Sequence, residues 1–167
     1  MKGETGTMKT NGKNRRRHMG FYERLLYMLS NYSAHAIWSA GLLWPTAEHL
    51  YQASKFEDIE IQESIRSASS PQRAKEIARA HQHLKRPEWP KVKLEVMRRI
   101  LVDKALQHPE VREALLGTGN VCLVQDSQDD SFWGWGRDHR GNNYLGRLWM
   151  EIRAELRAGK YQLFETA

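Results

Sequence analysis

The spacing of apolar residues along the chain predicts a series of helices separated by short polar turns. Where apolar positions recur every three or four residues, they form one face of a helix, and that face packs on a core. Serine, threonine or proline stands at the start of several of these segments, as is typical of helix N-termini. The sequence therefore predicts helices over about residues 47–56, 58–67, 71–79, 90–107, 109–116 and 145–157.

Three apolar runs are too short for helices and predict strands. Residues 36–38 and 42–44 flank a three-residue turn that ends in Gly41, a pattern typical of a β-hairpin. Residues 121–124 form an apolar run between polar residues, which predicts a buried strand. The sequence therefore predicts an α+β fold, a compact and mainly helical single domain with a few short β-strands.

Charge is distributed unevenly along the 167 residues, whose formal net charge is +6. Residues 1–18 carry six basic side chains, one acidic side chain and almost no apolar ones, so we expect a disordered basic arm. Residues 64–104 carry eleven basic and four acidic side chains, a net charge of +7. We expect the domain to span residues 19–160, followed by a short tail over 161–167. The basic excess favours an anionic partner.

Composition excludes several classes of protein. A single cysteine cannot form an internal disulfide, which favours a reducing, cytoplasmic location. No apolar stretch approaches the roughly 20 residues that span a bilayer, so we expect no membrane span and no membrane partner. The seven histidines are scattered and the cysteine lies in an apolar run, so the sequence predicts neither a metal site nor a cofactor.

The predicted helix after Pro45 places four residues on one face, because Glu48, Tyr51, Gln52 and Lys55 follow helical spacing. One interpretation is a solvated polar face with a weak ionic network. The other is the wall of a site, where burial would raise the pKa of the carboxyl and lower that of the amine. Glu48 would then suit a general acid or base, and Lys55 a nucleophile. The two interpretations differ in whether this face is buried.

A loop rich in aspartate, tryptophan and glycine precedes the last predicted helix, over residues 129–143. Glycines let a backbone approach a ligand closely, Trp133 or Trp135 can stack on a planar ring, and Asp130 can accept a hydrogen bond from a ribose hydroxyl. The alternative is a tight aromatic loop that only packs on the core.

Arg86 and Trp89 lie in a polar stretch between two basic predicted helices. An arginine can hold a phosphate and a tryptophan can stack on a base. The alternative is a solvated basic loop with one anchored tryptophan.

Several short motifs occur in order along about residues 21–156. They are Ser30-Asn31-Tyr32, the run from Trp44 to Phe56, Ser69-Ser70-Pro71 with Ala74-Lys75, Arg86 and Trp89, Lys93 with Val96-Met97, Phe132-Trp133-Gly134 with Gly136, Gly141, Asn143 and Leu145-Gly146, and Met150-Glu151-Ile152-Arg153. In this order they resemble the NADAR family, to which the bacterial YbiA-like N-glycosidases belong. Tyr32 stands where phenylalanine is common in that family, and the basic arm lies outside the resemblance.

The resemblance implies an enzyme that hydrolyses the N-glycosidic bond between ribose C1 and an exocyclic amine. It implies two substrate classes: phosphoribosylamino-pyrimidine intermediates of riboflavin synthesis, and ADP-ribose that DarT-type toxins attach to guanine in DNA and NADAR antitoxins remove. By resemblance, the catalytic pair is Glu48 and Lys55. The substrate-binding residues that it implies are Asn31, Trp44, Tyr51, Arg86, Trp89, Asp130, Trp133, Gly134 and Asn143.

Charge favours the DNA substrate, because basic side chains that contact phosphates release counterions. We therefore expect ADP-ribosylated DNA or ADP-ribose as partner, a DarT-type toxin as functional partner, and a flipped or single-stranded guanine as target. The riboflavin intermediate is the alternative. Outside this reaction, the protein would be a module that binds ADP-ribose or nucleic acid without cleaving it.

Two mechanisms fit the candidate residues. In the first, Lys55 attacks C1 to form a transient imine while Glu48 transfers protons. In the second, Glu48 and Asp130 act as a carboxylate pair through an oxocarbenium-like transition state.

Overall fold

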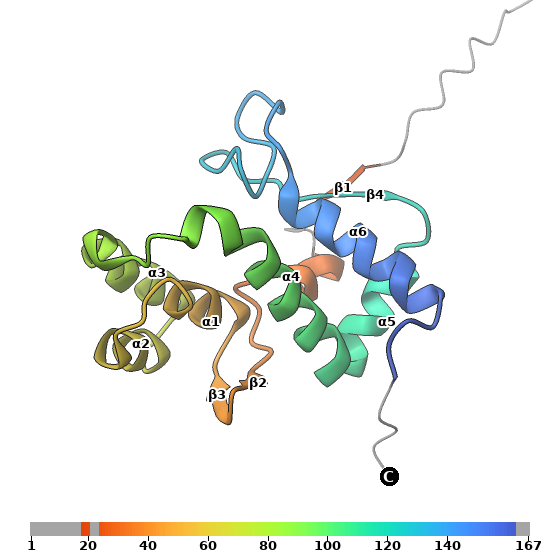
Figure 1. Cartoon of the computed structure of the whole chain (residues 1–167). Coiled ribbons are helices and arrows are strands. Elements are labelled where there is room, and N and C mark those ends of the chain that lie inside the picture. Colours follow the sequence, from red (N-terminus) through yellow and green to blue (C-terminus); the bar gives the residue numbers. More distant parts are fainter. Residues whose placement is uncertain (1–17, 21–23, 163–167) are drawn as a thin grey trace, which may run out of the picture.

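The computed structural model describes residues 18–20 and 24–162, and its helices follow the predicted order (Figure 1). The elements in chain order are β1 (His18–Gly20), the 3₁₀-helix η1 (Arg24–Leu29), β2 (Ile37–Ser39), β3 (Leu42–Trp44), α1 (Ala47–Ala53), α2 (Ile59–Arg66), α3 (Pro71–Ala80), the 3₁₀-helix η2 (Gln82–Leu84), α4 (Trp89–Gln107), α5 (Pro109–Gly117), β4 (Cys122–Val124) and α6 (Tyr144–Arg157). The mainly helical α+β class is confirmed. Over these residues, no helix is both long and apolar enough to cross a membrane.

Helix α4 is the element around which the other helices are arranged. It contacts α1 on one side and α5 and α6 on the other, and β2 lies against it (Figure 1). Its side chains Met97, Ile100 and Leu101 are buried in the hydrophobic core. Trp149 of α6 is fully buried beside them, and its indole N–H donates to the carbonyl oxygen of Leu29 at 2.9 Å. The apolar faces of the helices thus share a common core.

Two helix N-termini are capped by the side chains that the sequence indicates. The hydroxyl of Thr46 accepts the backbone N–H of His49 at 3.3 Å, and that of Ser70 accepts the N–H of Arg73 at 3.1 Å. Pro71 follows Ser70 in the first turn of α3, where its fixed φ suits a helix start. These local signals explain why the starts of α1 and α3 were predicted correctly.

Helix α1 ends at Ala53, earlier than the predicted end at residue 56. The Ser54 hydroxyl donates to the carbonyl oxygen of Leu50 at 2.7 Å, and the N–H of Lys55 reaches back only three residues, to Gln52 at 3.3 Å. Serine hydroxyls compete with the backbone in this way, and such tightened turns often close a helix. Lys55 therefore lies on a turn just beyond the helix.

The strands form two pairs within the described residues. Strands β2 and β3 make the predicted antiparallel hairpin, but its turn has two residues, Ala40 and Gly41, with φ of 50° and 76°. Positive φ at both positions is the geometry that two-residue hairpin turns favour. Strand β1 pairs in parallel with β4, placing His18 opposite Cys122. The sequence indicates β4 but not β1.

The predicted arm and tail lie largely outside the described residues. Residues 1–17 and 163–167 are not among them, and His18, which was assigned to the arm, is the first residue of β1. Tyr161, which was assigned to the tail, is bonded to α4 and α6: its hydroxyl donates to Glu155 and accepts from Arg98 at 3.3 Å.

The long loop between β4 and α6 is held at its ends by Asn143. This residue has a φ of 50°, and its side chain accepts the N–H of Gln125 and donates to the carbonyl oxygen of Leu123, both at 2.9 Å. One turn later, Gly146 lies so close to β4 that a Cβ would stand 2.2 Å from the Leu123 oxygen. Glycine is therefore required where α6 crosses β4.

We predict that Gly146→Ala lowers the free energy of unfolding by about 3 kcal/mol, because its methyl group overlaps the backbone of β4. Gly117→Ala is the matched control, since a Cβ at Gly117 meets nothing within 4 Å. Urea denaturation followed by circular dichroism measures both. Equal stability of the two variants would contradict the close packing of α6 on β4.

Candidate active site

A cavity of about 350 Å³ opens between α1, α4 and the loop that follows β4. Its wall combines polar, charged and aromatic side chains from segments far apart in the sequence. The lining residues are Ser30, Asn31, Tyr32, Glu48, Tyr51, Gln52, Lys55, Lys75, Met97, Gln125, Ser127, Asp129, Asp130, Trp133 and Leu145. The cavity is therefore the place in the fold where the predicted motifs converge.

The polar face of α1 is buried, so the interpretation of this face as solvated is wrong. Glu48 is 7% exposed and Gln52 is 3% exposed, although both are polar. Every residue of α1 is buried, because the apolar face packs on the core while the polar face forms the cavity wall. Burial of this kind is costly for polar groups unless they are hydrogen-bonded.

A chain of hydrogen bonds joins the two predicted catalytic residues through Gln52. The amide nitrogen of Gln52 donates to Glu48 Oε1 at 2.7 Å, and Lys55 Nζ donates to Gln52 Oε1 at 2.5 Å. Gln52 thus holds the carboxyl and the amine at a fixed separation. The sequence placed Gln52 on the same face but not among the site residues, and its spacing of four from Glu48 and three from Lys55 is the signal that indicates this role.

Burial shifts both titratable groups away from their charged forms. It raises the pKa of the Glu48 carboxyl above its ordinary value, despite the hydrogen bond from Gln52 and the nearby lysines. Burial also lowers the pKa of Lys55 to about 8, against the opposing effect of Glu48 and with help from Lys85, Lys75 and Lys93. At pH 7 this raises the neutral fraction of the Lys55 amine by about two orders of magnitude over an ordinary lysine.

Aromatic rings surround the phenol of Tyr51 beside this chain. The ring centroid of Trp89 lies 5.2 Å away and that of Trp133 lies 5.5 Å away, nearly perpendicular to it. Lys55 Nζ lies 5.1 Å from the centre of the Tyr51 ring. Burial raises the pKa of Tyr51, which keeps its hydroxyl protonated. This cluster gives the cavity a rigid apolar side next to the amine.

Asp130 and Trp133 form part of the cavity wall contributed by the loop after β4. Asp130 Oδ1 accepts the backbone N–H groups of Phe132 at 3.0 Å and Trp133 at 2.8 Å. These bonds fix the turn that carries the Trp133 ring to Tyr51. One oxygen of Asp130 thus has a structural role, and the carboxylate still lines the cavity.

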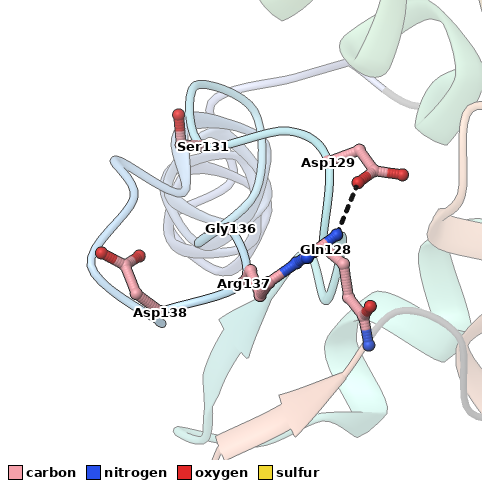
Figure 2. A pocket seen from close by; sticks show the side chains of 6 residues that line it. All are labelled: Gln128, Asp129, Ser131, Gly136, Arg137 and Asp138. Carbon is pink, nitrogen blue, oxygen red and sulfur yellow. Dashed lines mark ion pairs between the residues drawn. The ribbon is translucent and has the colours of Figure 1, made fainter.

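A second cavity, of about 300 Å³, lies on the loop that follows β4 (Figure 2). Its lining residues are Gln128, Asp129, Ser131, Gly136, Arg137 and Asp138. Asp129 lines both cavities and pairs with Arg137 at 3.6 Å. Asp129 therefore belongs to the walls of both cavities.

The structure divides the predicted site residues into two groups. Six of them line the main cavity: Asn31, Glu48, Tyr51, Lys55, Asp130 and Trp133. The other five, Trp44, Arg86, Trp89, Gly134 and Asn143, are not among its lining residues. Their contact with substrate stays a prediction.

The five residues of the second group lie outside the lining of the main cavity and make other contacts. Arg86 donates its backbone N–H to the carbonyl oxygen of Lys55 at 3.0 Å, but its side chain lies over Trp89 and lines a separate cavity behind α1. Trp89 packs on Tyr51. A Cβ on Gly134 would stand 2.5 Å from the carbonyl oxygen of Gln125, so the loop closes tightly there. Trp44 is a buried core residue, and Asn143 bridges to β4 as described above.

Lys75 is a cavity residue that the resemblance motifs include but that was not assigned to the site. It comes from the first turns of α3, which contacts α1 directly.

No group of three or more His, Cys, Asp or Glu side chains in residues 18–20 and 24–162 is arranged to hold a metal ion.

The model of the NADAR domain family matches residues 18–157 of this chain. The chain belongs to the NADAR family. Among curated relatives, it is 42% identical over 127 residues to the N-glycosidase YbiA of Escherichia coli, covering 76% of this chain and 79% of YbiA. It is 40% identical over 131 residues to the N-glycosidase Npun_R5314 of Nostoc punctiforme, covering 77% of this chain and 84% of that protein.

A further NADAR relative is longer than this chain. The riboflavin biosynthesis protein VVA0006 of Vibrio vulnificus is 40% identical over 128 residues, which are 77% of this chain but only 35% of that protein. The solution NMR structure of Escherichia coli YbiA superimposes with a TM-score of 0.79 at 37% identity, covering 90% of this chain and 92% of YbiA. The NADAR fold therefore extends over nearly the whole described chain.

We predict that Lys75→Met raises the pKa of Lys55 above about 8, because it removes a nearby positive charge that disfavours the ammonium form. The pH dependence of Lys55 acylation, followed by peptide mass spectrometry, measures this pKa. Lys91→Met is the matched control, since Lys91 is exposed and is not among the charges that act on Lys55. A Lys55 pKa that is the same in both variants would show that Lys75 does not act on the amine.

Proposed function

We propose that this protein is an N-glycosidase that hydrolyses the bond between ribose C1 and an exocyclic amine, with ADP-ribosylated guanine in DNA as its substrate. The observation that carries the proposal is the buried chain from Glu48 through Gln52 to Lys55, which presents an acid and a partly neutral amine to one cavity. The relatives named N-glycosidases in the same family support the reaction class.

In this proposal the reaction begins with proton transfer from Glu48. The carboxyl, whose pKa burial raises above its ordinary value, gives its proton to the ribose ring oxygen. The bond from C1 to the ring oxygen breaks as the lone pair of the exocyclic nitrogen forms a double bond to C1. The sugar is then open, C1 is electrophilic, and Glu48 is a carboxylate.

Lys55 then replaces the amine at C1. Its neutral amine adds to C1, one of its protons passes to the exocyclic nitrogen, and the bond between C1 and that nitrogen breaks. The product is a protonated imine between Lys55 and C1. Water adds to C1, and Glu48 takes up the proton that water releases. The proton of the new hydroxyl passes to the Lys55 nitrogen as its bond to C1 breaks, which restores the neutral amine and leaves the free sugar aldehyde. The competing route uses Glu48 and Asp130 as a carboxylate pair and forms no bond to Lys55.

Positive charge around the cavity supports an anionic substrate with several phosphates. Lys75 lines the cavity, and Lys85 and Lys93 lie close enough to affect Lys55. Such a set of cations suits the phosphates of ADP-ribose or of the DNA strand. The main cavity is at the lower end of ligand-site sizes, and Asp129 at its edge also lines the second cavity.

The second candidate substrate is a phosphoribosylamino-pyrimidine intermediate of riboflavin synthesis. Two relatives support it by name, the Vibrio vulnificus protein described above and a chloroplastic riboflavin biosynthesis protein of Zea mays, which is 39% identical over 142 residues. The main cavity of about 350 Å³ suits this smaller molecule without the second cavity.

Side-by-side turnover of an oligonucleotide with ADP-ribose on guanine and of the pyrimidine ribosylamine phosphate distinguishes the two candidate substrates. Tight binding without product from either would favour a binding module.

We predict that Lys55→Ala and Glu48→Ala each lower kcat by about 100-fold or more, because each removes one reacting group from the chain. Circular dichroism checks that both variants fold. Addition of borohydride during turnover should leave a reduced sugar adduct on Lys55 that mass spectrometry detects. Active enzyme without any adduct would favour the carboxylate route instead.

We predict that removing residues 1–17, which carry the predicted basic arm up to the start of β1, weakens DNA binding and lowers its salt dependence. Turnover of a short modified oligonucleotide should be largely retained, since the cavity is built from residue 30 onward. Fluorescence anisotropy at several salt concentrations measures the binding. Loss of turnover on the short substrate would refute this division of roles.

A further inference from the structure

Lys104 is a fully buried lysine outside the cavity, in the C-terminal half of α4, with 0% of its side chain exposed. Burial lowers its pKa to about 7. Its Nζ donates to the carbonyl oxygen of Ser30 at 2.8 Å and to the hydroxyl of Ser33 at 2.6 Å. Both partners are uncharged. Burying an amine costs free energy that an apolar side chain of the same size would not, so its place in the structure calls for a specific role.

The two partners of Lys104 belong to the turn at residues 30–33, and part of this turn lines the cavity. Ser30, Asn31 and Tyr32 all contribute to the cavity wall. The segment is tightly folded, since the Ser33 hydroxyl also bonds to the carbonyl oxygen of Ser30 at 2.9 Å and the Ser33 N–H does so at 3.2 Å. Lys104 therefore joins α4 to this turn over a sequence separation of more than 70 residues.

The turn at residues 30–33 contacts Glu48 directly through the backbone of Asn31. The backbone carbonyl oxygen of Asn31 accepts the N–H of Glu48 at 3.0 Å. This N–H lies in the first turn of α1, where backbone N–H groups have no partner within the helix. The position of the Glu48 carboxyl in the cavity thus depends on where the turn places Asn31.

The side chain of Asn31 points to a second consequence of this placement. Its amide nitrogen donates to Met97 Sδ at 3.5 Å, while its oxygen Oδ1 is buried and has no hydrogen-bond partner. A buried acceptor without a donor is unfavourable. Since Asn31 lines the cavity, an N–H or O–H group of a bound substrate can supply the missing donor.

We infer that Lys104 is a positioning residue of the active site, which holds the turn at residues 30–33 so that Asn31 supports Glu48 through its backbone and offers Oδ1 to a donor on the substrate. The inference rests on the proposed function for the identity of that substrate. The link from Lys104 to Glu48 is independent of the proposed function, because it follows from the hydrogen bonds alone.

The test replaces Lys104 with methionine, which keeps the length of the side chain and removes its donors. We expect Lys104→Met to lower kcat by about 10- to 100-fold on the modified oligonucleotide, as displacement of a reacting group by about 1 Å does. Thr118→Val is the matched control, because it removes another buried hydrogen bond, from Arg153 at 2.6 Å, at residues that do not line the cavity. It should lower the melting temperature and leave kcat unchanged.

A second readout separates this inference from the proposed function. Glu48 raises the pKa of Lys55, so displacement of Glu48 in Lys104→Met should move the midpoint of Lys55 acylation to lower pH by about half a unit. This measurement needs no turnover, so it remains decisive if the wild-type protein cleaves neither substrate. If Lys104→Met does not fold, Ser33→Ala takes its place in the test. It removes one of the two acceptors of Lys104 and should shift the midpoint of Lys55 acylation in the same direction by a smaller amount.

A melting temperature lowered equally in Lys104→Met and Thr118→Val, with kcat and the acylation midpoint unchanged in both, would overturn the inference. Lys104 would then only stabilise the fold. Loss of kcat in Lys104→Met while Ser33→Ala changes neither kcat nor the acylation midpoint would overturn it as well, since the turn would not transmit the effect.

Discussion

The structure depends on the burial of both faces of α1. A seven-residue helix that is apolar on one side packs on the core and leaves its polar side free for solvent, yet here the polar side is also removed from water. The hydrogen bonds from Lys55 to Gln52 and from Gln52 to Glu48 make this burial tolerable, because each polar group finds a partner. The same burial shifts the two pKa values toward each other, so the constraint that α1 satisfies is also the origin of its chemistry.

The surrounding elements serve to keep this face enclosed. Helices α2 and α3 pack on α1 and on each other, and α4 contacts α1 as well (Figure 1). The loop after β4 closes the cavity with Asp130 and Trp133, and that loop is itself fixed by Asn143 and by the close approach of α6 to β4. Residues that the resemblance assigns to substrate binding, such as Trp89 and Gly134, occupy this supporting layer. A motif shared within a family marks a site as a whole, whether its residues touch the substrate or hold the ones that do.

Local signals were sufficient for helices α1 to α6, because caps such as Thr46 and Ser70 and the apolar periodicity act within a few residues, but not for the 3₁₀-helices η1 and η2. They were also sufficient to place Glu48 and Lys55 on one side of the chain, although not to show that this side is buried. The parallel pairing of β1 with β4 could not be predicted, since it joins segments about 100 residues apart and β1 has three residues. The direction of the Arg86 side chain could not be predicted either, because it lies over Trp89, whose ring packs on Tyr51 from a distant part of the chain.

Two buried lysines show how one physical effect supports two different roles. Desolvation lowers the pKa of both Lys55 and Lys104. Lys55 opens onto a cavity and is linked to a carboxyl through an amide, so its amine can meet an electrophile and exchange protons. Lys104 is enclosed between α4 and the turn at residues 30–33, where its donors have only fixed oxygen acceptors. Access to the cavity, and not the pKa, therefore separates a candidate nucleophile from a candidate anchor in this fold, and the anchor acts on the nucleophile only through the backbone that carries Glu48.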